Sequence, residues 1–173
     1  PEAMIIKSTN PFKGNMDIRR LDELIIKNGA ENVPFIRMEA STNLIGGQPF
    51  SMANLKEVRK VADRHKIIIV MDASLIGENA YFIKKREKEY ADSTIGAILN
   101  EMCNMSDIVY FSGRKVSSSR GGAICTNNKD LYNKMKDLVP LYEGFLTYGG
   151  ISIREIEAMT VGLYETLLED VVG

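Results

Sequence analysis

A lysine and an aspartate each follow an apolar run that predicts a buried strand. Lys115 comes shortly after the run 108–111, and Asp72 ends the run 67–71. In α/β sheets, ligands bind in the crevice outside the carboxyl ends of the strands, so both side chains could reach one such crevice. A lysine that loses water there becomes a usable nucleophile and proton carrier, because desolvation favours the neutral amine.

An amine and a carboxylate on neighbouring strand ends match the chemical needs of pyridoxal phosphate. The amine of Lys115 would form a Schiff base with the cofactor's aldehyde, and the carboxylate of Asp72 would hold the pyridine nitrogen protonated. Simpler interpretations stay open on position alone. Asp72 could equally be the N-cap of the following helix, and position alone favours an ordinary solvated lysine at 115.

Other polar residues follow the predicted strands. A segment rich in hydroxyls and positive charge surrounds the lysine, which suits a phosphate and suits a hydrated loop equally well. Its members are Ser112, Arg114, Ser117, Ser118, Ser119 and Arg120. Asn43 follows the first predicted strand and could donate to a cofactor oxygen, although an Asx-turn is the commoner role. His65 is predicted to be a surface residue stabilised by a helix C-terminus.

The composition is that of an ordinary globular domain. Of the 173 residues, 45% are hydrophobic and 26% charged, and the net charge of -1 gives no electrostatic case for nucleic acid or an anionic membrane as a partner. Two cysteines suit a reducing compartment, and without a signal peptide or a bilayer-length apolar run we expect a cytoplasmic protein. One histidine and no CxxC pair argue against a zinc site.

Strands alternate with helices, which predicts a three-layer α/β fold with a mostly parallel sheet. Strands are expected at 33–38, 67–72, 108–111 and 122–126. Because the second of these is rich in β-branched residues, we expect it to be covered on both faces. Helices are expected at 18–28 after Asp17 as N-cap, at 52–65 after Ser51, and at 77–89, 94–102, 129–141 and 151–168. The charge run 84–89 predicts a solvated face with i,i+4 pairs.

Five longer sequence runs together resemble a known protein family. They are NLIGGQPFSMAN at 43–54, MDAS at 71–74, ENAYFIK at 78–84, SGRK at 112–115 and YEGFLTYGG at 142–150. Together they resemble the β-eliminating lyases, the family of tryptophanase and tyrosine phenol-lyase, over nearly the whole chain. The resemblance implies the large, cofactor-binding domain of the aspartate-aminotransferase-type (fold type I) pyridoxal phosphate enzymes.

The same resemblance implies a role for each candidate residue. Lys115 matches the Schiff-base lysine, and Asp72 matches the acid on the pyridine nitrogen. Asn43 matches the asparagine near the cofactor's 3-oxygen, while Ser112 and Arg114 lie where the family packs groups near the phosphate. The implied reaction splits an aromatic amino acid into pyruvate, ammonia and indole or phenol, in a homo-oligomer. The runs 33–36 and 143–145 look more tryptophanase-like, so tryptophan is the expected substrate.

The chain departs from the family at several places. Leu75 stands where the family usually has an arginine beside the cofactor's 3-oxygen. The segment 116–122 differs and is about one residue shorter, which puts the family's monovalent-cation site for potassium in doubt. We expect residues 1–173 to be a partial large domain without its N-terminal part and without the small C-terminal domain. A non-catalytic truncated or degenerate relative, or another fold type I enzyme such as an aminotransferase, remains an alternative.

Overall fold

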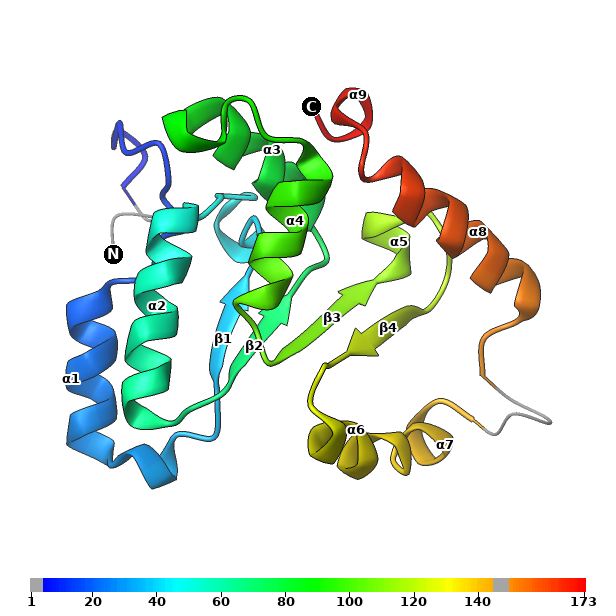
Figure 1. The fold of residues 1–173 in the computed structure, drawn as a ribbon, viewed down its shortest axis with the longest axis horizontal. Coiled ribbons are helices and arrows are strands. Elements are labelled where there is room, and N and C mark those ends of the chain that lie inside the picture. The colour runs from blue at the N-terminus through cyan, green and yellow to red at the C-terminus, as the bar shows by residue number, and fades with distance from the viewer. Residues whose placement is uncertain (1–4, 145–149) are drawn as a thin grey trace.

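Four strands form a single sheet in the computed structural model, which describes residues 5–144 and 150–173 (Figure 1). The strands are β1 (Ile36–Glu39), β2 (Ile69–Asp72), β3 (Ile108–Ser112) and β4 (Gly122–Cys125), in the spatial order β1-β2-β3-β4. The first three run parallel, and β4 runs antiparallel to β3. The predicted α/β class and the mostly parallel sheet are therefore confirmed.

One helix precedes the first strand, and the other helices of the described residues connect the strands or follow the last one. The helices are α1 (Ile18–Asn28), α2 (Met52–His65), α3 (Ile76–Arg86), α4 (Ile95–Asn104), α5 (Gly113–Val116), α6 (Lys129–Lys136), α7 (Val139–Tyr142), α8 (Ile153–Glu165) and α9 (Glu169–Val172). Short 3-10 turns lie at Ala30–Asn32, Asn43–Ile45 and Lys88–Tyr90. The helix predicted over 129–141 is thus divided into α6 and α7, and the last predicted helix stops at Glu165.

Two helix starts follow the capping residues that the sequence predicts. The Asp17 carboxylate accepts a hydrogen bond from the Arg20 N–H at 3.0 Å, and the Ser51 hydroxyl accepts one from the Asn54 N–H at 3.0 Å. Each bond satisfies one of the N–H groups that a helix leaves unpaired in its first turn. Gly29 ends α1 with a φ of 81°, a conformation that favours glycine.

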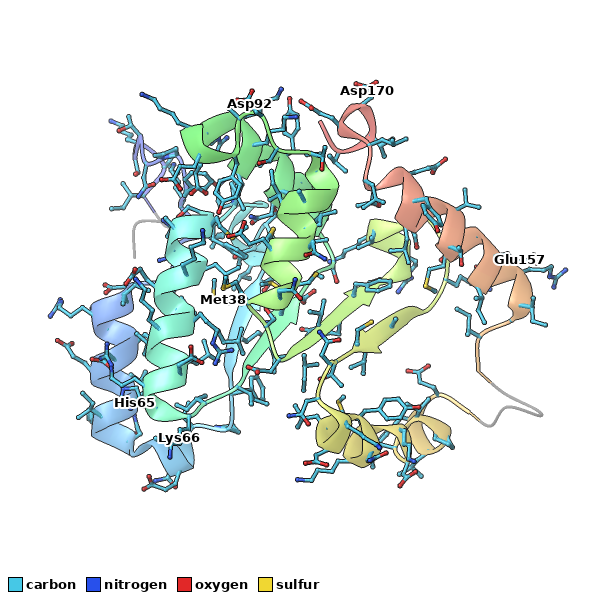
Figure 2. The ribbon with its side chains drawn as sticks, in the orientation of Figure 1. Met38, His65, Lys66, Asp92, Glu157 and Asp170 are labelled. Carbon is cyan, nitrogen blue, oxygen red and sulfur yellow. The ribbon has the colours of Figure 1, made fainter. Side chains whose placement is uncertain are left out.

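The core lies between one face of the sheet and helices α2, α3 and α4. The inward side chains of β1 and β2 are fully buried, and Figure 2 shows Met38 deep in the molecule. On this face β1 contributes Ile36 and Met38, and β2 contributes Ile69 and Met71. On α1, Ile25 is fully buried in this core, whereas Leu24 is 54% exposed.

The opposite face of the sheet is more open within the described ranges. Arg37 is exposed there, and Val70 and Asp72 are half-buried, because successive strand residues point to opposite faces. The expected cover on both faces of the 67–72 strand is therefore not found. Of the three predicted layers, residues 5–144 and 150–173 supply two.

The charge run 84–89 serves tertiary contacts. Lys84 and Lys85 each lie 2.7 Å from the Glu169 carboxylate of α9. Glu87 accepts a hydrogen bond from the N–H of Met52 at 2.6 Å, at the start of α2. Lys85, Arg86, Lys88 and Glu89 are exposed, so the predicted solvated face is present in part. The predicted i,i+4 pairs are not found in residues 5–144 and 150–173, because Lys84 and Lys85 pair with α9 and Glu87 bonds the start of α2. Among the described residues, no helix combines the length and the apolar character needed to cross a membrane.

Candidate functional site

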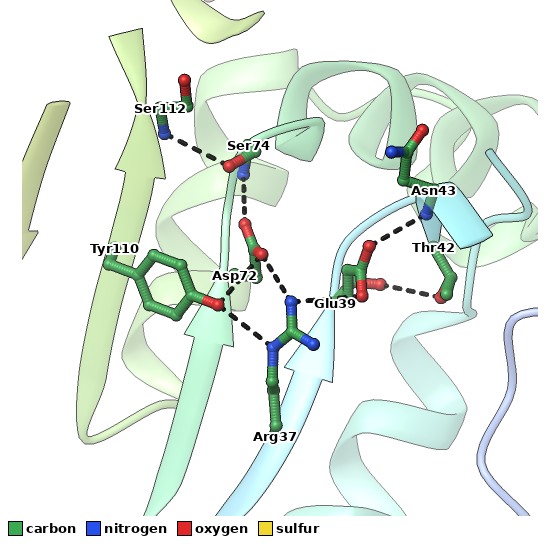
Figure 3. Close-up of polar contacts among 8 residues, drawn as sticks. All are labelled: Arg37, Glu39, Thr42, Asn43, Asp72, Ser74, Tyr110 and Ser112. Atoms are coloured by element: carbon green, nitrogen blue, oxygen red, sulfur yellow. Dashed lines mark hydrogen bonds and ion pairs between the residues drawn. The ribbon is translucent and has the colours of Figure 1, made fainter. Parts of the chain in front are cut away.

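Four polar side chains meet at the carboxyl ends of the parallel strands. The register places Glu39 opposite Asp72, and Asp72 opposite Tyr110. Arg37, two residues before Glu39 on β1, points to the same face. We call Arg37, Glu39, Asp72 and Tyr110 the carboxyl-edge cluster (Figure 3).

The carboxylate of Asp72 is held on both oxygens. Its Oδ2 accepts hydrogen bonds from Arg37 Nη2 at 2.8 Å and from the Tyr110 hydroxyl at 3.0 Å. Arg37 Nε also donates to the Tyr110 hydroxyl at 3.0 Å, which closes a ring of three side chains from three strands. Oδ1 accepts from the main-chain N–H of Ser74 at 3.1 Å. The direction of this carboxylate is therefore fixed from two sides.

The same contacts fix the charge of the pair. Partial burial raises the pKa of Asp72, but hydrogen bonds from Ser74, Arg37 and Tyr110 outweigh this and leave its pKa below the usual value. The hydrogen bond to Asp72 is the main cause that raises the pKa of Arg37. Asp72 is thus an ionised carboxylate at neutral pH. It does not cap the next helix, since α3 begins after Leu75 without a side-chain cap.

The cluster reaches Asn43 through Glu39. Glu39 Oε2 lies 3.3 Å from Arg37 Nη2, and Glu39 Oε1 accepts from the main-chain N–H of Asn43 at 2.9 Å. Figure 3 shows the Asn43 amide pointing away from the cluster. Within the described ranges this amide makes no hydrogen bond, so the expected Asx-turn is not found, and the amide is available to a ligand.

Ser112, at the end of β3, is connected to the carboxyl-edge cluster through Ser74. Its main-chain N–H donates to Ser74 Oγ at 3.2 Å, and Ser74 in turn holds Asp72. The Ser112 hydroxyl makes no hydrogen bond to any other described residue. Three of the predicted site residues, Asn43, Asp72 and Ser112, are thus linked by one polar network across three strand ends.

Arg114 and Lys115 lie on α5, the single helical turn that directly follows β3. Both side chains are exposed. Neither side chain forms an ion pair or a hydrogen bond with the part of the chain that the structure describes. In particular, no such contact joins Lys115 to Asp72. The structure therefore places both residues at the carboxyl edge, with their charged groups exposed and without a partner among the described residues.

The serines after Lys115 form a packed turn. Ser117 and Ser119 are buried. The Ser117 hydroxyl donates to the Gly113 carbonyl at 2.9 Å, and the Ser119 hydroxyl donates to the Arg120 carbonyl at 3.2 Å. These two hydroxyls are neither phosphate ligands nor part of a hydrated loop, so both interpretations left open by the sequence are wrong for them.

Helix α8 presses against this turn. A Cβ at Gly162 would lie 2.4 Å from the carbonyl oxygen of Ser117, so only glycine allows the two backbones to approach this closely. The Thr166 hydroxyl also donates to the Val116 carbonyl at 2.8 Å. The turn that follows Lys115 is therefore held in place by its packing against α8.

Asn79 is a structural residue that the sequence analysis did not identify. It is fully buried on α3, and its Oδ1 accepts from the N–H groups of Ser41 (3.0 Å) and Phe50 (3.1 Å). Its Nδ2 donates to the Phe50 carbonyl at 2.9 Å. Both ends of the loop that carries Asn43 are thereby tied to α3.

Two further sequence expectations concern histidine and metals. His65 is the last residue of α2, as predicted, but its side chain is 17% exposed and lies 2.7 Å from Asp22, so it is half-buried and paired and not fully at the surface. In residues 5–144 and 150–173, no group of three or more metal-ligating side chains is present. Leu75 is half-buried immediately before α3.

Comparisons with known proteins identify relatives over most of the chain. A family model described as β-eliminating lyase matches residues 2–166. Tyrosine phenol-lyase of Pasteurella multocida is 46% identical over 158 residues, which are 91% of this chain and 34% of that protein. The tyrosine phenol-lyase of Symbiobacterium thermophilum is 42% identical over 99% of this chain and 38% of its own length. The chain thus spans about a third of the length of these relatives.

Solved structures share the fold at low sequence identity. A protein from Listeria monocytogenes assigned as an L-allo-threonine aldolase has a TM-score of 0.57 and 19% identity, and covers 80% of this chain and 34% of its own. A protein from Exiguobacterium assigned as an aromatic amino acid β-eliminating lyase or threonine aldolase has a TM-score of 0.55 and 20% identity, and covers 76% of this chain and 32% of its own. At such identities these structures support the fold alone.

Proposed function

The chain belongs to the family of β-eliminating lyases, and we propose that its carboxyl edge holds pyridoxal phosphate in an enzyme that removes the aromatic group from Cβ of an amino acid. The observation that carries this proposal is an ionised Asp72 at the same sheet edge as the exposed Lys115, whose amine has no ion-pair or hydrogen-bond partner among the described residues. Because the curated relatives are about three times as long, residues 1–173 would be part of a large, cofactor-binding domain.

The chemistry of the donor set fits the cofactor. Lys115 offers an amine to the aldehyde, and Asp72 offers a carboxylate to the ring nitrogen. The exposed amide of Asn43 suits the 3-oxygen, and the Ser112 hydroxyl and Arg114 guanidinium suit a phosphate. When bound, pyridoxal phosphate supplies a ring that accepts electrons from the substrate.

The residues of the chain would then share the remaining work. Lys115 would hold the cofactor's aldehyde carbon, and its Nζ, when released, would be placed to take the α-proton of the substrate. Asp72 would stabilise a protonated ring nitrogen, because hydrogen bonds from Ser74, Arg37 and Tyr110 keep its carboxylate ionised. Asn43 is oriented by the Glu39 carboxylate, which holds its main-chain N–H.

Tyrosine is the substrate we propose, with phenol as the leaving group. The curated relatives described above are tyrosine phenol-lyases. The expectation of tryptophan rested partly on residues 33–36, which lie at the amino end of β1, away from Asp72. It also rested on 143–145, of which residue 145 lies outside the described residues. The balanced reaction takes tyrosine and water to phenol, pyruvate and ammonia.

Several expectations stay predictions under this proposal. They are a homo-oligomer, a cytoplasmic location and a dependence on potassium, which the altered segment 116–122 puts in doubt. The non-catalytic alternative also stays open, because Leu75 replaces a family arginine and the chain spans only about a third of its relatives.

A titration with pyridoxal phosphate tests the cofactor site. We expect a visible absorbance band that borohydride removes, and we expect Lys115→Ala to abolish it. Lys129→Ala, which changes another exposed lysine at the start of α6, should leave the band intact. A band that is unchanged in Lys115→Ala, or no band in the parent protein, would overturn the proposal.

Product analysis tests the reaction. Incubation with tyrosine should release phenol, pyruvate and ammonia in equal amounts, and incubation with tryptophan should release less indole. A keto acid without free ammonia would indicate an aminotransferase instead. A lysine-bound cofactor with no product from either amino acid would favour the non-catalytic relative.

A further inference from the structure

The two oxygens of the Asp72 carboxylate have unequal numbers of donors. A carboxylate oxygen has about two lone-pair sites for hydrogen bonds. Oδ2 uses both, on Arg37 at 2.8 Å and Tyr110 at 3.0 Å. Oδ1 accepts one hydrogen bond from the described residues, from the Ser74 N–H at 3.1 Å, and the Ser74 hydroxyl also lowers the pKa of Asp72. Arg37 and Tyr110 thus both bond Oδ2 and leave Oδ1 to Ser74 and to a further donor.

The charges of the carboxyl-edge cluster also favour a further, cationic donor. Arg37 is the single guanidinium in the cluster and is paired with two carboxylates, Asp72 at 2.8 Å and Glu39 at 3.3 Å. Two negative charges and one positive charge leave the cluster with a net charge of -1. A cationic donor at Oδ1 would complete both the hydrogen bonding and the charge balance of the cluster.

We propose that Arg37 and Tyr110 are positioning residues that hold Oδ2 of Asp72 and so present Oδ1 to a protonated ring nitrogen. This inference rests on the proposed function and names residues that neither the sequence motifs nor the comparisons assign. Arg37 and Tyr110 act through Asp72 and touch neither substrate nor cofactor.

The mechanical reason lies in the side-chain torsion of aspartate. The terminal torsion of a carboxylate is broad, so its plane is set by its partners. Arg37 reaches Asp72 from β1 and Tyr110 reaches it from β3, while their own hydrogen bond at 3.0 Å keeps both donors in place. A binding group held by such supporting contacts loses less affinity to misorientation.

Two substitutions separate positioning from a simple charge effect. Arg37→Lys keeps the positive charge but cannot donate from Nε and Nη2 at once. Tyr110→Phe removes one donor and keeps both the ring and the charge. If only charge mattered, both variants would bind pyridoxal phosphate as the parent does.

The experiment compares two probes by equilibrium titration. The first is pyridoxal phosphate, and the second is its 1-deaza analogue, in which a C–H replaces the ring nitrogen. For pyridoxal phosphate we expect a weakening of about 10-fold in Arg37→Lys and about 3-fold in Tyr110→Phe, typical of one charged and one neutral hydrogen bond. For the analogue we expect no change in either variant.

The control is Arg59→Lys, which alters an arginine–aspartate pair at the amino end of the same strands. It should leave the affinity for both probes unchanged. If Arg37→Lys does not fold, Tyr110→Phe decides the matter, because that change preserves the ring in the sheet.

Each remaining outcome overturns a defined claim. Unchanged or tighter binding of pyridoxal phosphate in both variants would overturn the positioning role, and so would an equal loss for the deaza analogue. If the parent protein itself fails to bind pyridoxal phosphate at Lys115, the proposed function falls and this inference falls with it.

Discussion

Two arginine–aspartate pairs lie at opposite edges of the same sheet. At the amino edge, Arg59 Nη1 lies 2.7 Å from Asp107 Oδ2, and at the carboxyl edge, Arg37 Nη2 lies 2.8 Å from Asp72 Oδ2. The two distances are almost equal. The pairs differ in what else their atoms contact, and that difference separates a structural pair from a candidate site.

The amino-edge pair is joined to the backbone. Asp107 Oδ2 also accepts from the Ile69 N–H at 2.7 Å, and Arg59 donates to the Ile67 carbonyl at 3.4 Å. Arg59 is only 19% exposed. This pair fixes the start of β2 and offers little to a ligand.

The carboxyl-edge pair is joined to other side chains and remains accessible. Arg37 is 48% exposed, and its further partners are the Tyr110 hydroxyl and the Glu39 carboxylate. Because the Arg37 side chain bonds no main-chain group in residues 5–144 and 150–173, its loss should disturb the site more than the fold. The comparison teaches that the distance within an ion pair does not reveal its role, whereas the destination of its other hydrogen bonds does.

The largest effect should come from breaking the amino-edge pair. Asp107→Ala leaves the Ile69 N–H and Nη1 of the mostly buried Arg59 without the acceptor that they share, which should cost about 2–4 kcal/mol of unfolding free energy. Chemical denaturation measures this loss. Asp63→Ala removes the exposed partner of the same arginine and should cost at most about 0.5 kcal/mol. Equal losses in the two variants would contradict the assigned structural role.

A smaller effect should appear when the carboxyl-edge pair is tested by acid. The pKa of Asp72 in the folded protein is lowered below its usual 3.8, so its ionised form stabilises the fold above that pH. The stabilisation is lost as the pH falls through the folded-state pKa. Arg37→Gln should raise the pKa of Asp72. It should therefore reduce the loss of unfolding free energy on acidification by less than about 1 kcal/mol, because the pair is partly exposed.

The titration is followed most directly by the 13Cγ chemical shift of Asp72. Arg19→Gln provides the control, because Arg19 forms an exposed i,i+4 pair with Glu23 on α1. It should leave the Asp72 titration unchanged. An Asp72 midpoint that is the same in Arg37→Gln and in the parent protein would show that Arg37 does not support the charge of this carboxylate.

Local signals in the sequence predict much of this fold. Asp17 and Ser51 mark helix starts because N-capping depends on a few consecutive residues. The apolar runs before Asp72 and Ser112 predict β2 and β3, and the polar residues that follow them do gather at one sheet edge. These features needed no knowledge of strand register.

The carboxyl-edge cluster depends on register and was missed. Arg37 lies 35 residues before Asp72 and 73 residues before Tyr110, and only parallel pairing brings the three together. One signal was present in the alternation of apolar and charged residues from 36 to 39, which predicts a strand with one polar face. The hydrogen bond of Glu87 to the start of α2 was also missed, because it joins two helix ends that are 35 residues apart in the sequence.

The measurement that tests the central claim most directly is a map of where pyridoxal phosphate binds covalently. The protein is saturated with the cofactor, reduced with borohydride, digested and analysed by mass spectrometry. We predict one modified lysine, Lys115, at the carboxyl edge. Lys66, which ends α2 and lies on the surface in Figure 2, should be unmodified. Label spread over many lysines, or concentrated on one other than Lys115, would contradict the account.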